Sequence, residues 1–312
     1  MTSNGAWYMV GRLDVEIAGL KLANPTMLAA GILGMSGLTL KRVAEAGAGA
    51  VVTKSLGLEA RTGYSNPTVV QVKGGLVNAM GLPNPGIEHF AQEMSDTKGI
   101  ETPIIASIYA FSPQQFAIIA KKAMRVAVDG LELNVSCPHA ERTGAEIGQD
   151  PKLIEAAVKA AKGSGEKPVF VKLTPNVANI AELAGAAEKA GADAIVAINT
   201  VKAMVIDIET ARPILGNRVG GLSGTAIKPI AVRCVYEIYE AVEIPIVGCG
   251  GIETWQDAVE FMEAGASAIQ IGTAVATKGI TVFGQVTDGI EAFLVKKGFD
   301  EVKEIVGISH RN

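Results

Sequence analysis

The chain has 312 residues, of which 48% are hydrophobic and 5% aromatic, and its formal net charge is -4. This composition allows a large buried core, and it excludes the basic, aromatic-rich surfaces typical of nucleic-acid binding. No apolar run approaches the roughly 18 residues of a membrane-spanning helix, and Met1 to Gly11 lacks the pattern of a secretion signal, so we expect a soluble, cytoplasmic protein.

An N-terminal hairpin is predicted over Gly11–Leu22. Buried strands are then predicted at Thr26–Ala30, Ala50–Thr53, Ile104–Ile108, Gly130–Leu133, Val169–Leu173, Ala194–Ile198, Pro245–Val247 and Ala268–Ile271. Helical patterns lie between them at Leu40–Ala46, Pro113–Val128, Pro151–Lys162, Ile180–Lys189, Pro229–Ala241 and Trp255–Glu263. This alternation indicates parallel strands joined by crossover helices.

The number of strands favours a closed barrel over an open, doubly wound sheet. We therefore predict an α/β fold, a (β/α)8 TIM barrel whose bottom is closed by the N-terminal hairpin. The segment Leu56–Lys98 is too long for a simple connection, and we expect loops and a small accessory sheet there, over the barrel mouth. No shift in composition marks a boundary, so residues 1–312 are predicted to form a single domain.

A weak repeat supports this fold. Glu45–Val51, Lys189–Ile195 and Glu263–Ile269 each carry Ala-Gly-Ala between a helix and a strand. The pattern predicts a helix that ends with a left-handed glycine before a short loop. It bears on the fold and not on function.

Polar residues and glycines follow most of the predicted strands, where the functional residues of barrels gather. They are Lys54-Ser55, Asn134, Asn199-Thr200, Gly250-Gly251 and Gly272-Thr273, and Lys172 lies near the end of the fifth strand itself. The two Gly-containing pairs can present bare backbone N–H groups to a phosphate. Two tight turns that need glycine are the competing interpretation.

Side chains at these positions are suited to an anionic ring substrate. Lys54 and Lys172 would be costly to bury without anions, so we expect one to stabilise negative charge on a reduced flavin and the other to meet a substrate carboxylate. The competing interpretation is a pair of surface lysines. Asn78, Asn134 and Asn199 can donate to and accept from the edge of a dihydropyrimidine, although each alone is also typical of a turn.

The three cysteines differ in their settings. An odd, sparse set without a CxxC pair indicates a reducing compartment, and it provides neither an iron–sulfur cluster nor another metal site on this chain. Cys234 and Cys249 are interpreted as small buried apolar residues. Cys137 lies in a polar loop between Ser136 and Pro138, and a modest fall in pKa would let its thiol act as a base. It is predicted to be the catalytic base in dehydrogenation of a C–C bond.

Several motifs stand in order along the chain. They are Lys54-Ser55, Asn78-Ala79-Met80-Gly81-Leu82-Pro83-Asn84-Pro85-Gly86, Asn134-Val135-Ser136-Cys137-Pro138, Val171-Lys172-Leu173-Thr174-Pro175-Asn176, Ile198-Asn199-Thr200, Gly220-Gly221-Leu222-Ser223-Gly224 and Gly250-Gly251. From about Leu13 to the C-terminus, the chain resembles the class 1 dihydroorotate dehydrogenases, and within them the catalytic subunit of the NAD-linked B form. The resemblance implies oxidation of dihydroorotate to orotate in pyrimidine synthesis.

The resemblance also implies residue roles, with Cys137 as the base. FMN would be held by Ala30, Lys54, Ser55, Asn134, Lys172, Ile198, Gly224, Gly250, Gly251, Gly272 and Thr273. Dihydroorotate would be held by Lys54, Asn78, Ala79, Met80, Gly81, Leu82, Asn134, Asn199 and Thr200. The B form pairs with a subunit that carries FAD and a 2Fe-2S cluster, so a homodimer within a heterotetramer is expected, with NAD reduced on the other chain.

Four positions depart from the family pattern. Ala30 replaces Ser, Ser107 replaces Asn, His139 replaces Asn and Thr225 replaces Pro. The last three are similar to the barrel of dihydropyrimidine dehydrogenase, which acts on dihydrouracil and dihydrothymine, so oxidation of those substrates is the second hypothesis. Fumarate-linked dihydroorotate oxidation is a third. A non-flavin phosphate-binding barrel, such as a sugar-phosphate isomerase or lyase, and a non-catalytic assembly subunit are also compatible with the fold.

Overall fold

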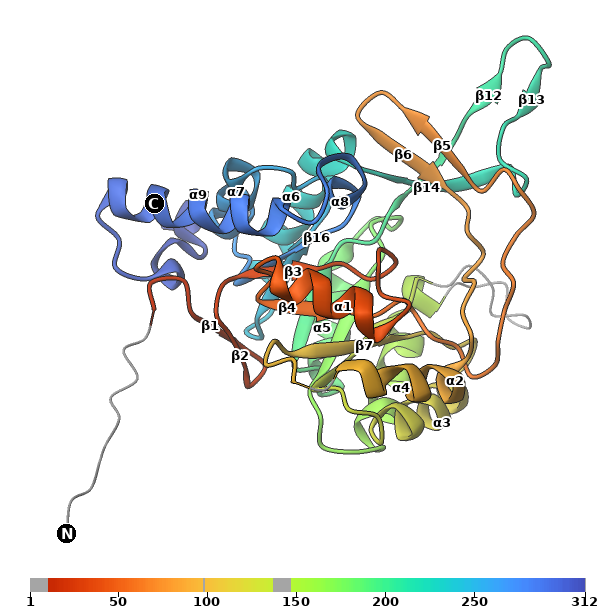
Figure 1. Cartoon of the computed structure of the whole chain (residues 1–312), viewed down its shortest axis with the longest axis horizontal. Helices are drawn as coiled ribbons and strands as arrows, with labels where there is room; N and C mark the ends of the chain where they lie inside the picture. The colour runs from red at the N-terminus through yellow and green to blue at the C-terminus, as the bar shows by residue number, and fades with distance from the viewer. Residues whose placement is uncertain (1–10, 98, 137–146, 312) are drawn as a thin grey trace.

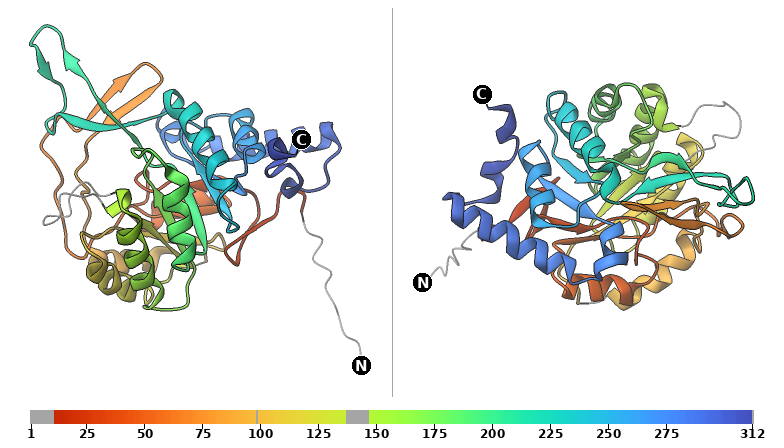
Figure 2. Two further views of the ribbon diagram at one scale, coloured as in Figure 1. Left: turned by 180° about the vertical axis from the view of Figure 1, so that it is seen from behind. Right: turned by 90° about the horizontal axis from the view of Figure 1, so that it is seen from above.

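A computed structural model describes residues 11–97, 99–136 and 147–311. Eight parallel strands form a closed barrel, with helices around it (Figures 1 and 2). In barrel order the strands are β10 (Ala194–Ala197), β15 (Ile246–Cys249), β16 (Ala268–Ile271), β3 (Thr26–Leu28), β4 (Ala50–Val52), β7 (Ile104–Ile108), β8 (Gly130–Asn134) and β9 (Val169–Leu173). This confirms the predicted (β/α)8 barrel.

The described residues contain nine α-helices, of which six match predicted stretches with several shifted ends and three were not predicted. They are α1 (Gly37–Glu45), α2 (Ile87–Glu93), α3 (Pro113–Ala123), α4 (Pro151–Lys162), α5 (Ile180–Lys189), α6 (Lys228–Tyr239), α7 (Trp255–Glu263), α8 (Thr273–Lys278) and α9 (Val282–Lys297). Helix α1 begins three residues before the predicted Leu40 because the Ser36 hydroxyl caps it by accepting from the Thr39 N–H. Short 3-10 turns are η1 (Met94–Thr97), η2 (Ile147–Gln149), η3 (Thr225–Ile227), η4 (Val302–Ile305) and η5 (Ile308–His310).

The glycines of the repeat have the predicted left-handed backbone. The φ angles are +99° at Gly47, +97° at Gly191 and +121° at Gly265. A side chain at Gly265 would lie 2.4 Å from the Tyr239 ring, so this position excludes a Cβ on two grounds. Each glycine turns the chain from a helix toward the next barrel strand.

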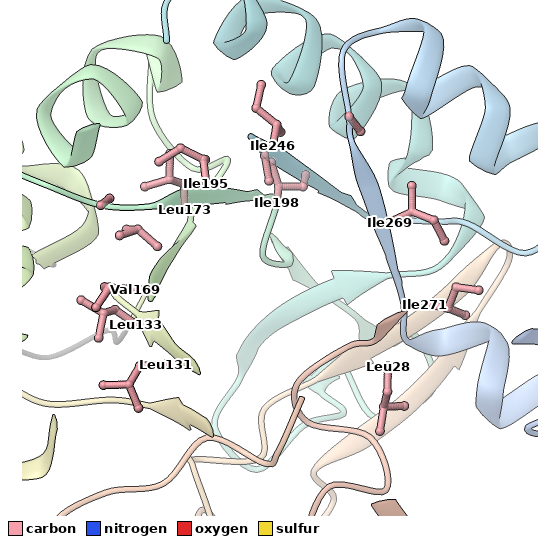
Figure 3. Close-up of a cluster of buried hydrophobic side chains, with 14 of the residues drawn as sticks. Leu28, Leu131, Leu133, Val169, Leu173, Ile195, Ile198, Ile246, Ile269 and Ile271 are labelled. Atoms are coloured by element: carbon pink, nitrogen blue, oxygen red, sulfur yellow. The ribbon is translucent and has the colours of Figure 1, made fainter. Parts of the chain in front are cut away.

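Alternation along the strands divides the core into two layers. Side chains such as Leu131, Ile195 and Ile269 belong to a large cluster shared with the helices (Figure 3). Their neighbours in sequence, such as Val196 and Ala268, form a second cluster inside the barrel. Polar side chains continue the inward-facing rows of the strands toward their C-terminal ends, which is where the site lies.

The N-terminal hairpin consists of β1 (Val15–Ile17) and β2 (Leu20–Leu22). Its Ile17 and Leu22 are buried in the same cluster as the inward-facing Met27, Ala50 and Phe170. The hairpin therefore covers the apolar interior at the N-terminal ends of the strands, as predicted.

The accessory sheet has four strands, in the order β11 (Val201–Met204), β14 (Val219–Ser223), β6 (Gly75–Asn78) and β5 (Val69–Val72). The prediction placed this sheet within Leu56–Lys98, which was wrong for half of it because β11 and β14 follow β10. Between them, β12 (Ile206–Asp207) and β13 (Arg212–Pro213) form a hairpin that projects from the barrel in both orientations (Figures 1 and 2).

Among the described residues, no helix combines the length and the apolar character needed to cross a membrane.

Candidate active site

A cavity of about 700 Å³ lies at the C-terminal ends of the barrel strands, within the size range of small-molecule sites. The predicted cofactor residues that line it are Ala30, Lys54, Ser55, Asn134, Lys172, Ile198, Gly224, Gly250, Gly251, Gly272 and Thr273. The predicted substrate residues that line it are Lys54, Asn78, Ala79, Met80, Gly81, Leu82, Asn134, Asn199 and Thr200. Residues far apart in sequence therefore meet around one space.

Two residues of the sequence-based hypothesis, Cys137 and His139, lie outside the described residues. The segment that precedes them is described. Ser136 lines the cavity, and its buried hydroxyl has no hydrogen-bond partner within the described part of the chain. A buried hydroxyl is usually satisfied, so this oxygen is available to a group outside the described residues, including a ligand.

A row of polar side chains joins three strand ends at the cavity wall. The Asn199 amide donates to Asn134 Oδ1 at 3.3 Å, and the Asn134 amide donates to the Ser55 hydroxyl at 3.2 Å. The Ser55 hydroxyl lies 2.9 Å from that of Ser107, which is fully buried. This row fixes which amide atoms of Asn134 and Asn199 face the cavity.

Lys54 brings an unpaired positive charge to the cavity. Its ammonium group has no hydrogen bond or ion pair within residues 11–97, 99–136 and 147–311. Burial lowers the pKa of Lys54 because the charged form is poorly solvated there. An anion bound beside it would reverse that effect, so the site is electrostatically prepared for an anionic ligand.

Lys172 is also buried, at 5% exposure, and it lies in a polar network across the barrel. Its ammonium donates to Gln270 Oε1 at 2.7 Å, and the Gln270 amide donates to Glu132 Oε2 at 2.7 Å. Burial alone would lower the pKa of Lys172, but Cys249 and Glu132 offset this effect, so the pKa lies above its ordinary value. Burial raises the pKa of the Cys249 thiol above its ordinary value, and the neighbouring Lys172 ammonium opposes that effect.

Glycines after β15 bring bare backbone to the cavity. Gly250 and Gly251 have φ angles of +135° and +78°, and their N–H groups make no hydrogen bond within the described chain. A Cβ at Gly251 would lie 2.8 Å from the Gly224 carbonyl oxygen, so a side chain has no room. Unpaired N–H groups in close-packed turns are typical of phosphate sites, and this favours the phosphate interpretation over simple turns.

The loop after β6 forms another wall of the cavity through Met80, Gly81 and Leu82. It is held by Asn84, whose buried side chain makes four hydrogen bonds. Asn84 Oδ1 accepts from the Gly57 and Gly86 N–H groups at 3.0 and 2.9 Å, and Nδ2 donates to the Leu82 carbonyl and the Tyr109 hydroxyl at 2.9 and 2.8 Å. A loop anchored in this way can present its backbone to a ligand in a fixed geometry.

The departures from the family pattern occupy different places. Ala30 lines the cavity, whereas Ser107 and Thr225 do not. The Thr225 hydroxyl donates to the Gly74 carbonyl at 3.2 Å, at the turn between β5 and β6. Ser107 supports Ser55 from below. Among the described departures, only Ala30 is therefore in a position to touch a ligand directly.

Sequence reasoning missed several residues of the cavity. Gln270 and Cys249 line it beside Lys172, although Cys249 was interpreted as a buried apolar residue. Glu132 lies beneath it. The available signal was a charged or amide side chain within an otherwise apolar strand, as in Leu131-Glu132-Leu133 and Ile269-Gln270-Ile271, because such a group needs a partner inside the barrel.

Comparison with known proteins agrees with this geometry. The family model described as "Dihydroorotate dehydrogenase" matches residues 12–294. A protein of Methanosarcina acetivorans is 54% identical over 297 residues, covering 95% of this chain and 95% of its own length. Proteins of Pyrococcus abyssi and Methanothermobacter thermautotrophicus are 53% and 52% identical, covering 95% and 96% of this chain and 99% and 98% of their own. Each is named "Dihydroorotate dehydrogenase B (NAD(+)), catalytic subunit". The chain therefore belongs to the dihydroorotate dehydrogenase family of oxidoreductases.

Proposed function

We propose that this chain oxidises (S)-dihydroorotate to orotate in pyrimidine synthesis, with residues 1–312 acting as one FMN-binding barrel. The observation that carries the proposal is the meeting of Asn78, Asn134 and Asn199 with the unpaired Lys54 in one cavity. The amides match a ring edge of alternating carbonyl and N–H groups. The lysine matches the carboxylate that dihydroorotate has and dihydrouracil lacks. Membership of the family supports the same reaction.

FMN agrees with the donors that the cavity offers. Its phosphate matches the unpaired N–H groups of Gly250 and Gly251, and the negative charge that its ring would acquire on reduction matches the ammonium group of Lys172. The residues proposed to hold it are Ala30, Lys54, Ser55, Asn134, Lys172, Ile198, Gly224, Gly250, Gly251, Gly272 and Thr273. When bound, FMN supplies the acceptor for the hydride that leaves the substrate.

The chain itself binds the ring and removes the proton. Cys137 is proposed to take a proton on Sγ from the ring carbon next to the one that loses the hydride, which leaves the C=C bond of orotate. Lys54, Asn134, Asn199, Thr200 and the segment Asn78 to Leu82 are proposed to orient the ring. Because the Asn199 amide donates to Asn134 and the Asn134 amide donates to Ser55, the remaining N–H of each amide is oriented before substrate arrives.

The direct test is anaerobic titration of the purified, FMN-loaded protein, followed by absorbance in the flavin region. Dihydroorotate should bleach the flavin at a lower concentration and a higher rate than dihydrouracil, because only the former gives Lys54 a carboxylate. Faster bleaching by dihydrouracil would assign the protein to dihydropyrimidine oxidation instead. A protein that takes up no FMN would contradict the whole proposal.

The base is tested with Cys137→Ala and Cys137→Ser. Both should retain FMN, since the thiol is not among the proposed cofactor contacts. Both should slow flavin reduction by dihydroorotate by about a thousandfold, the usual scale for a lost general base, because an alanine has no basic group and a serine hydroxyl is a poor base near neutral pH. Unchanged reduction by either variant would remove Cys137 from the reaction.

A partner is proposed from the names of the relatives, which are called catalytic subunits of an NAD-linked enzyme. We propose that electrons pass to a subunit that carries FAD and a 2Fe-2S cluster, within a cytoplasmic heterotetramer built on a homodimer. The projecting β12–β13 hairpin supports an interface, because Ile206 and Ile208 are 55% and 87% exposed on it. Ile208→Lys should weaken the homodimer in sedimentation experiments, and an unchanged dimer would exclude the hairpin from that interface.

A further inference from the structure

A buried carboxylate lies beneath the cavity without lining it. Glu132 is 0% exposed on β8, and its Oε1 has no hydrogen-bond partner within the described residues. Its Oε2 accepts from Gln270 on β16, and Gln270 accepts from Lys172 on β9. Since β16 is not a neighbour of β8 or β9 in the barrel, the chain of hydrogen bonds crosses the barrel interior.

Burying this polar network in the barrel core costs free energy because its charged groups lose their hydration. Apolar side chains of similar volume would usually stabilise the fold equally well or better than a buried charged network. The inward-facing positions two residues earlier on the strands of Lys172 and Gln270, which are Phe170 and Ala268, are apolar. The polar set is confined to the level just below the cavity, and of its three members Lys172 and Gln270 reach the cavity surface while Glu132 does not. The position of this polar network indicates a role in the cavity and not in the stability of the core.

The hydrogen bonds have a direction. An ionised carboxylate only accepts hydrogen bonds, so Glu132 selects the NH₂ end of the Gln270 amide and turns the amide oxygen toward Lys172. That oxygen engages one of the three N–H bonds of the ammonium group. The other two are left to Cys249 and to the cavity. Without the carboxylate, the Gln270 amide could turn over and present its own donors to the lysine.

We propose that Glu132 is a positioning residue that acts through Gln270 to hold Lys172 as an ammonium ion directed into the cavity, toward the negative charge of a bound flavin. The inference rests on the proposed function, because the flavin is the group that benefits. It adds a residue that touches neither cofactor nor substrate and that determines the charge state of one that does.

The ionisable neighbours of Lys172 explain what removal of Glu132 should do. Desolvation lowers the pKa of Lys172, and Cys249 and then Glu132 are the groups that raise it. The Cys249 thiol is itself held neutral near pH 7 by burial. In a Glu132→Gln variant one of the two groups that oppose desolvation is removed, so we expect the pKa of Lys172 to fall. We expect Lys172 of the variant to lose its proton at a lower pH than Lys172 of the wild type, within the pH range of an ordinary assay.

The experiment measures FMN affinity by fluorescence titration between pH 7 and pH 9 in the wild type and in Glu132→Gln. The wild type should change less than about twofold, whereas the variant should bind at least about tenfold more weakly at pH 9 than at pH 7, since one unit of pKa displacement corresponds to a factor of ten. The matched control is Glu166→Gln, which makes the same chemical change at an exposed position and should behave as the wild type.

A second readout needs no flavin. With a lowered Lys172 pKa, the folded variant binds fewer protons than the folded wild type, so the Tm of apo Glu132→Gln should rise relative to the wild type as pH increases from 7 to 9. The double variant Glu132→Gln/Lys172→Gln should lose this pH dependence relative to the wild type, because the amine whose titration the single variant changes is gone. The double variant also keeps the test usable if the single variant folds poorly at pH 7.

Two results would overturn the inference. One is an FMN affinity of Glu132→Gln whose pH profile is parallel to that of the wild type, even if it is uniformly weaker, since that indicates only a structural role. The other is an apo Tm difference that does not change with pH. Failure of the proposed function is distinguishable, because it appears as a wild type that does not take up FMN, and the apo measurement then still reports whether Glu132 controls Lys172.

Discussion

Asn84 offers the sharpest test of how the cavity wall is built. Replacing it with alanine removes the acceptor of two buried backbone donors, the N–H groups of Gly57 and Gly86. An unsatisfied buried donor costs about 1–3 kcal/mol, so the free energy of unfolding should fall by about 4 kcal/mol in Asn84→Ala. That is a large share of the roughly 5–15 kcal/mol typical of a folded protein. At about 2 °C per kcal/mol for a chain of this size, Tm should fall by about 8 °C.

The same change should alter substrate binding more than turnover. Asn84 also holds the Leu82 carbonyl, so without it the backbone from Met80 to Leu82 is no longer fixed at the cavity. We expect the KM for dihydroorotate to rise about tenfold, equivalent to about 1.4 kcal/mol, with a smaller change in kcat. The assays are thermal unfolding and steady-state kinetics with an artificial electron acceptor.

The control for Asn84→Ala is Asn179→Ala, the same substitution at a helix cap. Asn179 accepts from the Glu182 N–H at the start of α5, and it does not line the cavity. Its loss should cost about 1 kcal/mol and leave KM unchanged. An Asn84→Ala variant as stable as this control, or one with wild-type KM, would refute the reasoning, because it would mean that water or a neighbouring group replaces the amide without effect.

Three further predictions follow from described contacts. Ser55→Ala removes the hydrogen-bond partner of the Ser107 hydroxyl and of the Asn134 amide. FMN affinity, measured by fluorescence, should therefore weaken about five- to tenfold, or about 1–1.4 kcal/mol. An unchanged affinity would exclude Ser55 from the site. Thr254→Ala removes the capping box of α7 and should cost about 1 kcal/mol in urea unfolding while kcat/KM stays constant; a loss of activity would be inconsistent with its position. Burial raises the pKa of Cys234 to about 11, so at pH 8 roughly one thiol in a thousand is ionised. A disulfide reagent should therefore label this residue only after the protein unfolds. Rapid labelling of Cys234 in the native protein would contradict its burial.

The barrel was predictable because its signals are local. Buried strands such as Val169–Leu173 and capped helices such as Pro151–Lys162 have the same bounds in the sequence prediction and in the structure. The helices α2, α8 and α9 and half of the accessory sheet were missed. Strands β11 and β14 have few buried residues, since their sheet is completed by pairing of β14 with β6 across more than a hundred residues of sequence, and no local pattern encodes that pairing.

The sequence predicted which residues line the cavity better than it predicted which of them contact one another. A position after a strand was enough to bring Lys54, Asn134 and Lys172 to one cavity. The partner of a buried group was not accessible in the same way. Glu132 and Gln270 are 138 residues apart, and their contact depends on the closure of the barrel and not on any spacing in the sequence. Roles that depend on such contacts require the structure.

The hairpin at the bottom of the barrel has a consequence for how substrate enters and product leaves the cavity. Ile17 and Leu22, with the apolar layer above them, block the barrel axis below the polar network. A substrate that reaches the asparagines must therefore leave, as product, by the side from which it came. Product and substrate then share one entrance and one binding site, so orotate should inhibit dihydroorotate oxidation competitively. Net flux through the enzyme would follow the ratio of the two molecules in solution as well as the supply of electron acceptor.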